Sequence, residues 1–401
     1  MLGKAEQGST VNAMTGIVIV GAGLGATRTA EQLRRANYAD AITIVGDEAH
    51  LPYDRPPLSK EVLRREVDDV ALKPQQWYDE RNIALRLGSP AGALDTAQRA
   101  VTCQDGRALG YHQLVIATGL IPRRIPAFPD LAGIRVLRSY DQAMALRKHA
   151  VTARRAVVVG AGFIGCEVAA SLRMLGVEVV LVEPQPVPLA SALGEQIGAL
   201  VTRLHRAHGV DVRTGTGVLE VRGQGQVDSV VLTDGTELMA DLVVVGVGSR
   251  PATDWLAGSG VEVNNGVICD EVGRTNVPQV WALGDVASWR RHGHQVRVEH
   301  WSNVAEQARA LVSAMLGQQV ATGVVVHYFW RDQYDVKIQC LGEPCATDIV
   351  HLVKDDRQAF LAFYERSGVV VGVVGAGMPS AVMKTRAAIV AGAPIAEVLA
   401  S

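Results

Sequence analysis

The chain has 401 residues, of which 48% are hydrophobic and 20% are charged, with a formal net charge of −2 at pH 7. This length exceeds what one hydrophobic core supports and predicts two or three domains. The small net charge argues against a nucleic-acid-binding protein that works through bulk electrostatics. No apolar run reaches the ~18 residues of a membrane span.

Five scattered cysteines fit a reducing cytoplasm: Cys103, Cys166, Cys269, Cys340 and Cys345. The last two are spaced Cys-x-x-x-x-Cys, which admits a redox disulfide, but a buried cysteine followed by a loop cysteine is the favoured interpretation. Residues 1–16 are polar and lack a hydrophobic signal core, so we expect a flexible leader outside the fold.

The first nucleotide-binding pattern begins with the apolar run Ile17–Val20, which predicts a buried strand. It leads into a G-x-G-x-x-A turn, Gly21–Ala26, that opens a helix. A second apolar strand, Ala41–Val45, ends at Asp47 and Glu48, roughly 20 residues past the glycines, as a dinucleotide-binding βαβ unit requires.

Each residue type in this turn has a physical role in holding a dinucleotide. Gly21 permits the tight turn, Gly23 lets the backbone approach a pyrophosphate, and Ala26 keeps the helix close to the strands. The helix N-terminus offers free N–H groups and a partial positive charge to the phosphates. An acidic side chain after the second strand can bind ribose hydroxyls, and we prefer Asp47 to Glu48 for this role.

Residues 61–110 predict a helix and short strands that close with a hairpin at Asp105-Gly106. Leu114–Gly119 follows as a buried strand that ends in small residues, against which a flat ring or a phosphate can lie. Three closely spaced prolines then mark the crossing to another domain: Pro122, Pro126 and Pro129.

A second nucleotide-binding pattern repeats the first about 140 residues later. It consists of the strand Ala156–Val159, the turn Gly160–Gly165, a helix, and the strand Val177–Val182, which ends at Glu183. One Rossmann domain explains one such fingerprint. Two fingerprints predict that the chain binds two dinucleotides.

Beyond the repeat, strands are expected at 241–248 and 280–287, and a helix begins after Val298 with Ser302 and Asn303 as caps. A third domain of antiparallel sheet and helix is then predicted, with strands at 328–341, 348–353, 360–364 and 369–374 and a helix at 381–391. The fold class is therefore α/β, with two Rossmann-like dinucleotide-binding domains and a C-terminal α+β domain. The domains are 17–119 with 245–322, 120–244, and 323–401.

The motifs together resemble the FAD-dependent NADH:ferredoxin reductases, which pass electrons to 2Fe-2S ferredoxins serving haem monooxygenases or Rieske-type dioxygenases. The most specific stretches are Pro56-Pro57-Leu58-Ser59-Lys60 and Phe329-Trp330-Arg331-Asp332-Gln333-Tyr334-Asp335. The resemblance covers nearly everything after residue 16 and implies a glutathione-reductase-like architecture. It also implies FAD and NADH as cofactors, and a cytoplasmic oxidoreductase.

The resemblance implies that the first pattern is the FAD site. Gly21, Gly23 and Gly25 would lie on the pyrophosphate and Asp47 on the adenosine ribose. Ala91 and Arg138 would lie at the adenine, Asp285 at the ribityl chain, and the backbone of Trp301 at the pyrimidine edge of the flavin. Arg55 would contact the pyrophosphate or fix its own loop, and both alternatives stay open.

The resemblance also implies catalytic residues and a second cofactor site. Lys60 would lie beside the hydride-accepting flavin nitrogen, with Glu167 as its carboxylate partner. NADH would lie on Gly160, Gly162, Ile164, Gly165 and Glu183. Glu183 repels a 2′-phosphate, and Pro184-Gln185-Pro186 supplies no cation to receive one, which favours NADH over NADPH. We expect no metal site, even at His292 and His294.

A 2Fe-2S ferredoxin is the expected partner, with Arg309, Trp330, Arg290 and Arg291 as its docking residues, and neither nucleic acid nor membrane is expected. One alternative is an NADH oxidase, or a reductase of rubredoxin or another small redox carrier, with the same fold. Another is a flavin-bearing signalling or DNA-associated protein, which would need basic surfaces and a targeting segment.

Overall fold

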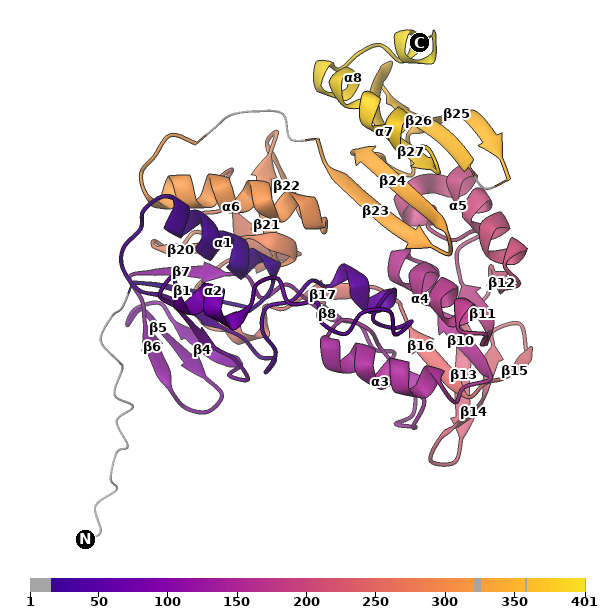
Figure 1. The fold of residues 1–401 in the computed structure, drawn as a ribbon, viewed down its shortest axis with the longest axis horizontal. Coiled ribbons are helices and arrows are strands. Elements are labelled where there is room, and N and C mark those ends of the chain that lie inside the picture. Colours follow the sequence, from indigo (N-terminus) through magenta and orange to yellow (C-terminus); the bar gives the residue numbers. More distant parts are fainter. Residues whose placement is uncertain (1–15, 321–325, 358, 401) are drawn as a thin grey trace. The chain divides into compact units, whose positions relative to one another are not determined.

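The computed structural model describes residues 16–320, 326–357 and 359–400 (Figure 1). Nearly all of the expected leader, residues 1–15, lies outside the described residues. The chain forms two compact units. Unit 1 contains the described residues of 1–54, 70–121 and 250–323, and unit 2 contains those of 55–69, 122–249 and 324–401.

Unit 1 is organised around a five-stranded parallel sheet with the strand order β20-β7-β1-β2-β3. Four of its strands are short, apolar and largely buried: β1 (Ile17–Val20), β2 (Ile42–Val45), β7 (Gln113–Ile116) and β20 (Val280–Ala282). In the edge strand β3 (Ile83–Arg86), only Ile83 is buried. Helices α1 (Leu24–Arg35) and α6 (Trp301–Met315) pack side by side, as Figure 1 shows. Apolar strands of this length suit a sheet buried on both faces.

Smaller elements complete unit 1. Strands β4 (Ala91–Asp95), β5 (Ala100–Cys103) and β6 (Ala108–Gly110) form an antiparallel sheet. A second small sheet joins β18 (Val263–Asn264), β19 (Gly266–Cys269), β21 (Ala287–Arg291) and β22 (His294–Val296). The short helices are α2 (Gln75–Asp79), η2 (Asp254–Leu256) and η3 (Gly284–Val286). Strands β8 (Leu120–Pro122) and β17 (Ser249–Pro251) lie where the chain passes between the units.

Unit 2 contains a second parallel sheet, with the order β12-β11-β10-β16-β9. The strands are β9 (Ile134–Arg135), β10 (Arg155–Val159), β11 (Glu178–Glu183), β12 (Asp211–Thr214) and β16 (Leu242–Val245). The helices are α3 (Tyr140–Ala150), α4 (Phe163–Met174) and α5 (Ala190–Ala207), and η1 (Pro56–Ser59) belongs to the same unit. Strands β13 (Val218–Gly223), β14 (Val227–Leu232) and β15 (Glu237–Met239) form an antiparallel sheet.

The C-terminal part of unit 2 is an antiparallel sheet with the order β23-β24-β27-β26-β25. Its strands are β23 (Tyr328–Gln333), β24 (Val336–Gly342), β25 (Ile349–Asp356), β26 (Ala359–Arg366) and β27 (Val369–Ala376), followed by α7 (Pro379–Lys384), α8 (Arg386–Ala391) and α9 (Ile395–Ala400). Side chains of β23, β24, β26 and β27 share one apolar core with α4 and α5. The expected α/β fold with a C-terminal α+β domain is confirmed.

Several element boundaries differ from those expected. The expected strand 328–341 is a hairpin that turns at Tyr334 and Asp335. Aspartate is a common turn residue, but the turn also needs a φ of 59° at Tyr334, which is rare outside glycine, so the sequence pattern did not indicate it. The expected strand 280–287 ends at Ala282, because η3 interrupts it. The helix after Val298 begins at Trp301, so Ser302 and Asn303 lie within its first turn and do not cap it.

Two further features concern the cysteines and the helices. All five cysteines are free; Cys340 is buried and Cys345 is exposed, as the non-disulfide interpretation predicts.

Among the described residues, no helix combines the length and the apolarity that crossing a bilayer requires.

Candidate functional site

The first glycine turn is shaped by two different constraints. Gly21 has a φ of 111°, and a Cβ there would lie 2.2 Å from the carbonyl oxygen of Ala117, so this position requires glycine. A Cβ on Gly23 would meet no atom within 4 Å. The open side of Gly23 is therefore not filled by the chain itself, and it fits a ligand phosphate at the N-terminus of α1. Gly25 is less constrained, since a Cβ there would make ordinary van der Waals contacts, the nearest with the Cβ of Ala117 at 3.4 Å.

Sequence-predicted residues gather at the carboxyl edge of this sheet. Gly21 follows β1, Asp47 follows β2, and Asp285 follows β20. The strand order reverses between β1 and β7, and open α/β sheets bind their ligands at such a switch point. Asp47 is exposed, whereas the carboxylate of Glu48 accepts a 2.7 Å hydrogen bond from the Tyr53 hydroxyl. This arrangement favours Asp47 over Glu48 as the ribose ligand.

The N-terminus of α6 is a second candidate cofactor contact in unit 1. Trp301 is its first residue, and the N-cap residue His300 makes no side-chain cap. The Trp301 indole Nε1 donates to Asp54 at 2.8 Å, so the side chain is held within the protein. Asn303 is buried; its Oδ1 accepts from Arg291, while its Nδ2 has no partner among the described residues. Such an orphaned buried donor fits an acceptor on a bound cofactor.

The remaining residues expected at the FAD fall in both units. Ala91 begins β4 in unit 1 and pairs with Cys103. Arg55 and Arg138 belong to unit 2, where Arg55 Nη1 donates to the Arg138 carbonyl at 2.7 Å. That contact favours the second of the two roles left open for Arg55, in which it fixes the loop before η1.

Lys60 lies in a buried cluster of charges inside unit 2. Its Nζ is 2.9 Å from Asp332 Oδ2 and 4.0 Å from Glu167 Oε1, and its side chain is 3% exposed. Ser59 Oγ donates to Glu167 Oε2 at 2.6 Å. Burial raises the pKa of the Glu167 carboxyl, an effect that the cations of Arg331 and Lys60 only partly offset.

The structure thus brings Lys60 and Glu167 together but places a different carboxylate closer to the lysine. Sequence reasoning missed Asp332 as this partner. A signal was present, because Asp332 belongs to the Phe-Trp-Arg-Asp-Gln-Tyr stretch that was singled out as specific. Nothing in the local pattern, however, indicates which cation that aspartate meets.

The second glycine turn repeats the construction of the first. Gly160 has a φ of 97°, and a Cβ there would lie 2.5 Å from the Gly246 carbonyl oxygen. A Cβ on Gly165 would lie 1.9 Å from the Gly160 carbonyl oxygen, so α4 needs glycine to pack this closely. A Cβ on Gly162 would meet nothing within 4 Å, which fits a second phosphate site. Ile164, on the first turn of α4, is exposed.

Glu183 has a structural role that the sequence did not reveal. Its Oε2 accepts a 2.6 Å hydrogen bond from the backbone N–H of Ala161, and its Oε1 accepts from the N–H of Gln185 at 3.0 Å. The carboxylate therefore anchors the glycine turn. Because each carboxylate oxygen has two lone pairs, it can still accept ribose hydroxyls.

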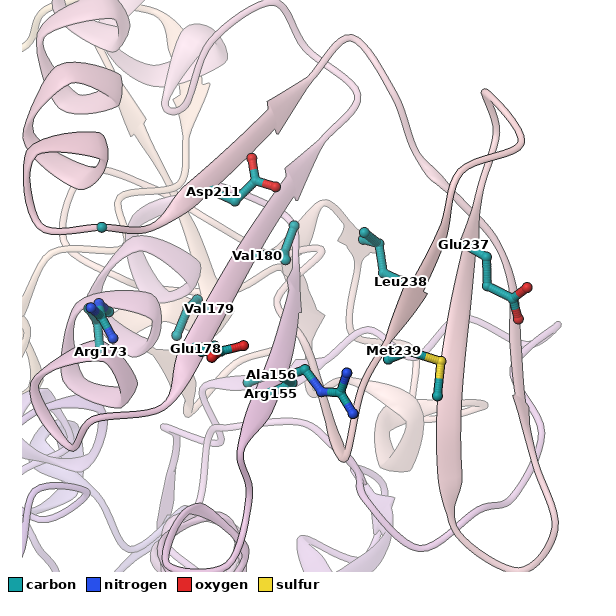
Figure 2. A pocket seen from close by; sticks show the side chains of 11 residues that line it. Arg155, Ala156, Arg173, Glu178, Val179, Val180, Asp211, Glu237, Leu238 and Met239 are labelled. Carbon is teal, nitrogen blue, oxygen red and sulfur yellow. The ribbon is translucent and has the colours of Figure 1, made fainter.

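Two cavities flank the unit 2 sheet at opposite ends. One, of about 670 Å³, lies past the carboxyl ends of β11 and β12 and is lined by Pro186, Arg203, Arg206 and Thr214 among others. The other, of about 410 Å³, lies at the amino ends, where Figure 2 shows Arg155, Glu178 and Asp211. Only the first is at the edge where α/β sheets bind nucleotides.

The expected docking cations carry neighbouring carboxylates. Arg309 pairs with Glu306 on α6, and Arg290 pairs with Glu271 at 2.7 Å. Trp330 stacks on Tyr328 with ring centroids 5.8 Å apart. Among the described residues, no group of three or more His, Cys, Asp or Glu side chains is placed to hold a metal ion.

Comparisons with known proteins agree with this geometry. Residues 15–308 match the family described as pyridine nucleotide-disulphide oxidoreductase, and residues 328–400 match the reductase C-terminal family. The ferredoxin–NAD(P)(+) reductase of a Sphingomonas species is 36% identical over 366 residues, covering 89% of this chain and 88% of that protein. The reductase component of the anthranilate 1,2-dioxygenase system of Burkholderia cepacia is 38% identical over 333 residues, covering 81% of each chain.

Solved structures give the same result. The reductase in the crystal structure of the covalent putidaredoxin reductase–putidaredoxin complex superposes with a TM-score of 0.92 at 31% identity, covering 97% of this chain and 96% of that one. With its two glycine turns on parallel sheets and its C-terminal antiparallel sheet, this chain belongs to the pyridine nucleotide-disulphide oxidoreductase family, among the ferredoxin–NAD reductases.

Proposed function

We propose that this protein takes hydride from NADH onto FAD and passes the electrons singly to a 2Fe-2S ferredoxin that serves a haem monooxygenase or a Rieske dioxygenase. The observation that carries the proposal is the pair of glycine turns, each with a second glycine, Gly23 or Gly162, where an added Cβ would meet no atom of the described residues within 4 Å. Two such turns suit two dinucleotides. The relatives named above are reductases of ferredoxins, which supports the choice of acceptor.

The domains divide this work. Residues 17–119 and 245–322 bind FAD, residues 120–244 bind the nicotinamide dinucleotide, and residues 323–401 form the C-terminal domain. FAD, when bound, converts a two-electron hydride donor into a source of single electrons. The turn at Gly21 and the N-terminus of α6 position it, and Asp47 and Asp285 bind its hydroxyl groups.

Lys60 and the carboxylates around it act on the reaction through electrostatics. Lys60 is buried, so its positive charge acts in a medium where it is poorly screened and stabilises negative charge nearby. Asp332 and Glu167 hold the lysine in place. Neither a nucleophile nor a metal is required of the chain, since hydride and electron transfer depend on orientation and electrostatics.

Glu183 supports NADH as the electron donor. Its carboxylate is anchored at the turn and would repel a 2′-phosphate, but the fold also brings Arg203 and Arg206 to the neighbouring cavity. Arg203 is paired with Asp355, and Arg206 donates to the Val212 carbonyl. Because both guanidinium groups already have partners, they are less able to bind a 2′-phosphate, and we infer a preference for NADH. The unpaired cysteines support a cytoplasmic location.

The test is NADH-dependent reduction of cytochrome c with and without an added 2Fe-2S ferredoxin. We expect the purified protein to be yellow, with the flavin absorbance near ~450 nm, and its cytochrome c reduction to depend on the ferredoxin. Equal rates without the ferredoxin, with oxygen consumed in its place, would identify an NADH oxidase. A rate restored by rubredoxin alone would identify the other alternative, a reductase of a different small carrier.

A further inference from the structure

Arg331 lies against the second glycine turn although it comes from the C-terminal sheet. Its guanidinium is 4.9 Å from the ring centroid of Phe163 and 5.7 Å from that of Phe329. The two rings meet edge to face at 5.1 Å. Phe163 is the first residue of α4 and directly follows Gly162. A cation from β23 is therefore held beside the N-terminus of the helix that opens this turn.

The guanidinium retains unused hydrogen-bonding capacity in this position. Its Nε is buried and has no hydrogen-bond partner among the described residues. Its Nη1 donates to the Trp330 carbonyl at 3.4 Å, near the limit for a hydrogen bond. A guanidinium carries five N–H donors, and a buried donor without a hydrogen bond costs free energy. Arg331 Nε therefore still needs an acceptor.

Glu167 does not supply that acceptor. Its Oε1 lies 4.0 Å from Arg331 Nε, an ion-pair distance that is too long for a hydrogen bond. That oxygen also has no hydrogen-bond partner among the described residues, while Oε2 accepts from Ser59. The two phenyl rings pack against the guanidinium beside the turn, which restricts the side chain before a ligand binds.

We propose that Arg331 binds the pyrophosphate of the nicotinamide dinucleotide held at the second glycine turn. This inference rests on the proposed function. A helix N-terminus attracts phosphate through its free N–H groups, and a neighbouring arginine adds a full charge and a planar pair of donors. Gly162 leaves the space above the turn open. The C-terminal domain thereby contributes a cofactor-binding residue to the Rossmann domain.

Calorimetric titration of the oxidised, FAD-loaded protein with NAD⁺ and with ADP-ribose tests this inference. ADP-ribose keeps the pyrophosphate but lacks the nicotinamide. Arg331→Gln is expected to weaken both ligands by a similar factor of about 10- to 100-fold, the usual effect of losing a charge-assisted hydrogen bond. Arg366→Gln is the matched control, because Arg366 lies on the same sheet but pairs with Asp348. It is expected to change neither affinity.

Several outcomes would overturn the inference. Unchanged affinities in Arg331→Gln would show that the arginine does not contact the ligand. A loss for NAD⁺ without a loss for ADP-ribose would place the contact at the nicotinamide. If Arg331→Gln does not fold, Arg331→Lys provides the test, because lysine keeps the positive charge but lacks the planar fork of donors. We expect Arg331→Lys to weaken the affinity for both ligands about 3- to 10-fold. Wild-type affinity in this variant would refute the proposal. A wild-type protein that binds neither ligand would instead refute the proposed function.

Discussion

The charge cluster around Lys60 allows a direct test of which carboxylate holds the lysine. The perturbation is Asp332→Asn, compared with Glu167→Gln. Asp332 Oδ2 lies 2.9 Å from Lys60 Nζ, and the Glu167 oxygen lies 4.0 Å away. If distance decides, loss of the Asp332 charge should be the more destabilising of the two changes.

The magnitude follows from the burial of the lysine. Removing one partner of a buried ion pair typically costs about 3–5 kcal/mol, because the other charge is left without compensation. Here Asp332 is 26% exposed, so water already screens part of the interaction and the loss is smaller. We expect Asp332→Asn to cost about 2–3 kcal/mol. Glu167→Gln should cost less than about 1 kcal/mol, because burial already disfavours the Glu167 charge and raises its pKa.

The assay is urea denaturation followed by circular dichroism at pH 7, with free FAD held constant, because ligand binding shifts the midpoint. Asp335→Asn is the control, since Asp335 lies on the same hairpin with its side chain 74% exposed, and we expect it to change stability by less than about 0.5 kcal/mol. A larger loss in Glu167→Gln than in Asp332→Asn would refute the reasoning. It would show that Lys60 depends on Glu167, as the pairing inferred from the sequence implied.

Three further outcomes are expected. Burial lowers the pKa of His205 to about 4, so about 3 kcal/mol of stability should be lost as the pH falls from 6.5 to 4, where the unfolded chain takes up a proton and the folded one does not. A pH series of urea midpoints should show a shallower loss in His205→Gln, and an equal loss would contradict this role. Glu183→Gln, which keeps an acceptor for the Ala161 N–H, should narrow the ratio of kcat/KM for NADH over NADPH, and an unchanged ratio would place the ribose contact elsewhere. Arg309→Glu should slow ferredoxin reduction in stopped-flow measurements and leave flavin reduction by NADH unchanged. The slowing should be modest because Glu306 already pairs with Arg309, and equal slowing of both steps would contradict a docking role.

Much of the architecture was predictable because it is encoded in short, local patterns. An apolar run, a glycine turn, a helical stripe, a second apolar run and a closing acid together indicate a βαβ unit, so both Rossmann sheets were expected from the sequence. The same is true of Gly21 and Gly160, whose left-handed φ values follow from the turn itself. Element boundaries were less predictable. The hairpin turn at Tyr334 lacks a glycine or an asparagine, and tertiary context imposes its conformation.

The sequence by itself thus determined the family, the two nucleotide turns and the acids that end their second strands. Only the tertiary structure decided which charges meet. Lys60 and Asp332 are 272 residues apart, and Arg331 reaches the second glycine turn from the C-terminal sheet. Local patterns specify elements because helix and strand periodicities are short-ranged. Ion pairs between distant segments depend on how those elements pack, and the spacing of residues in the sequence does not predict that packing.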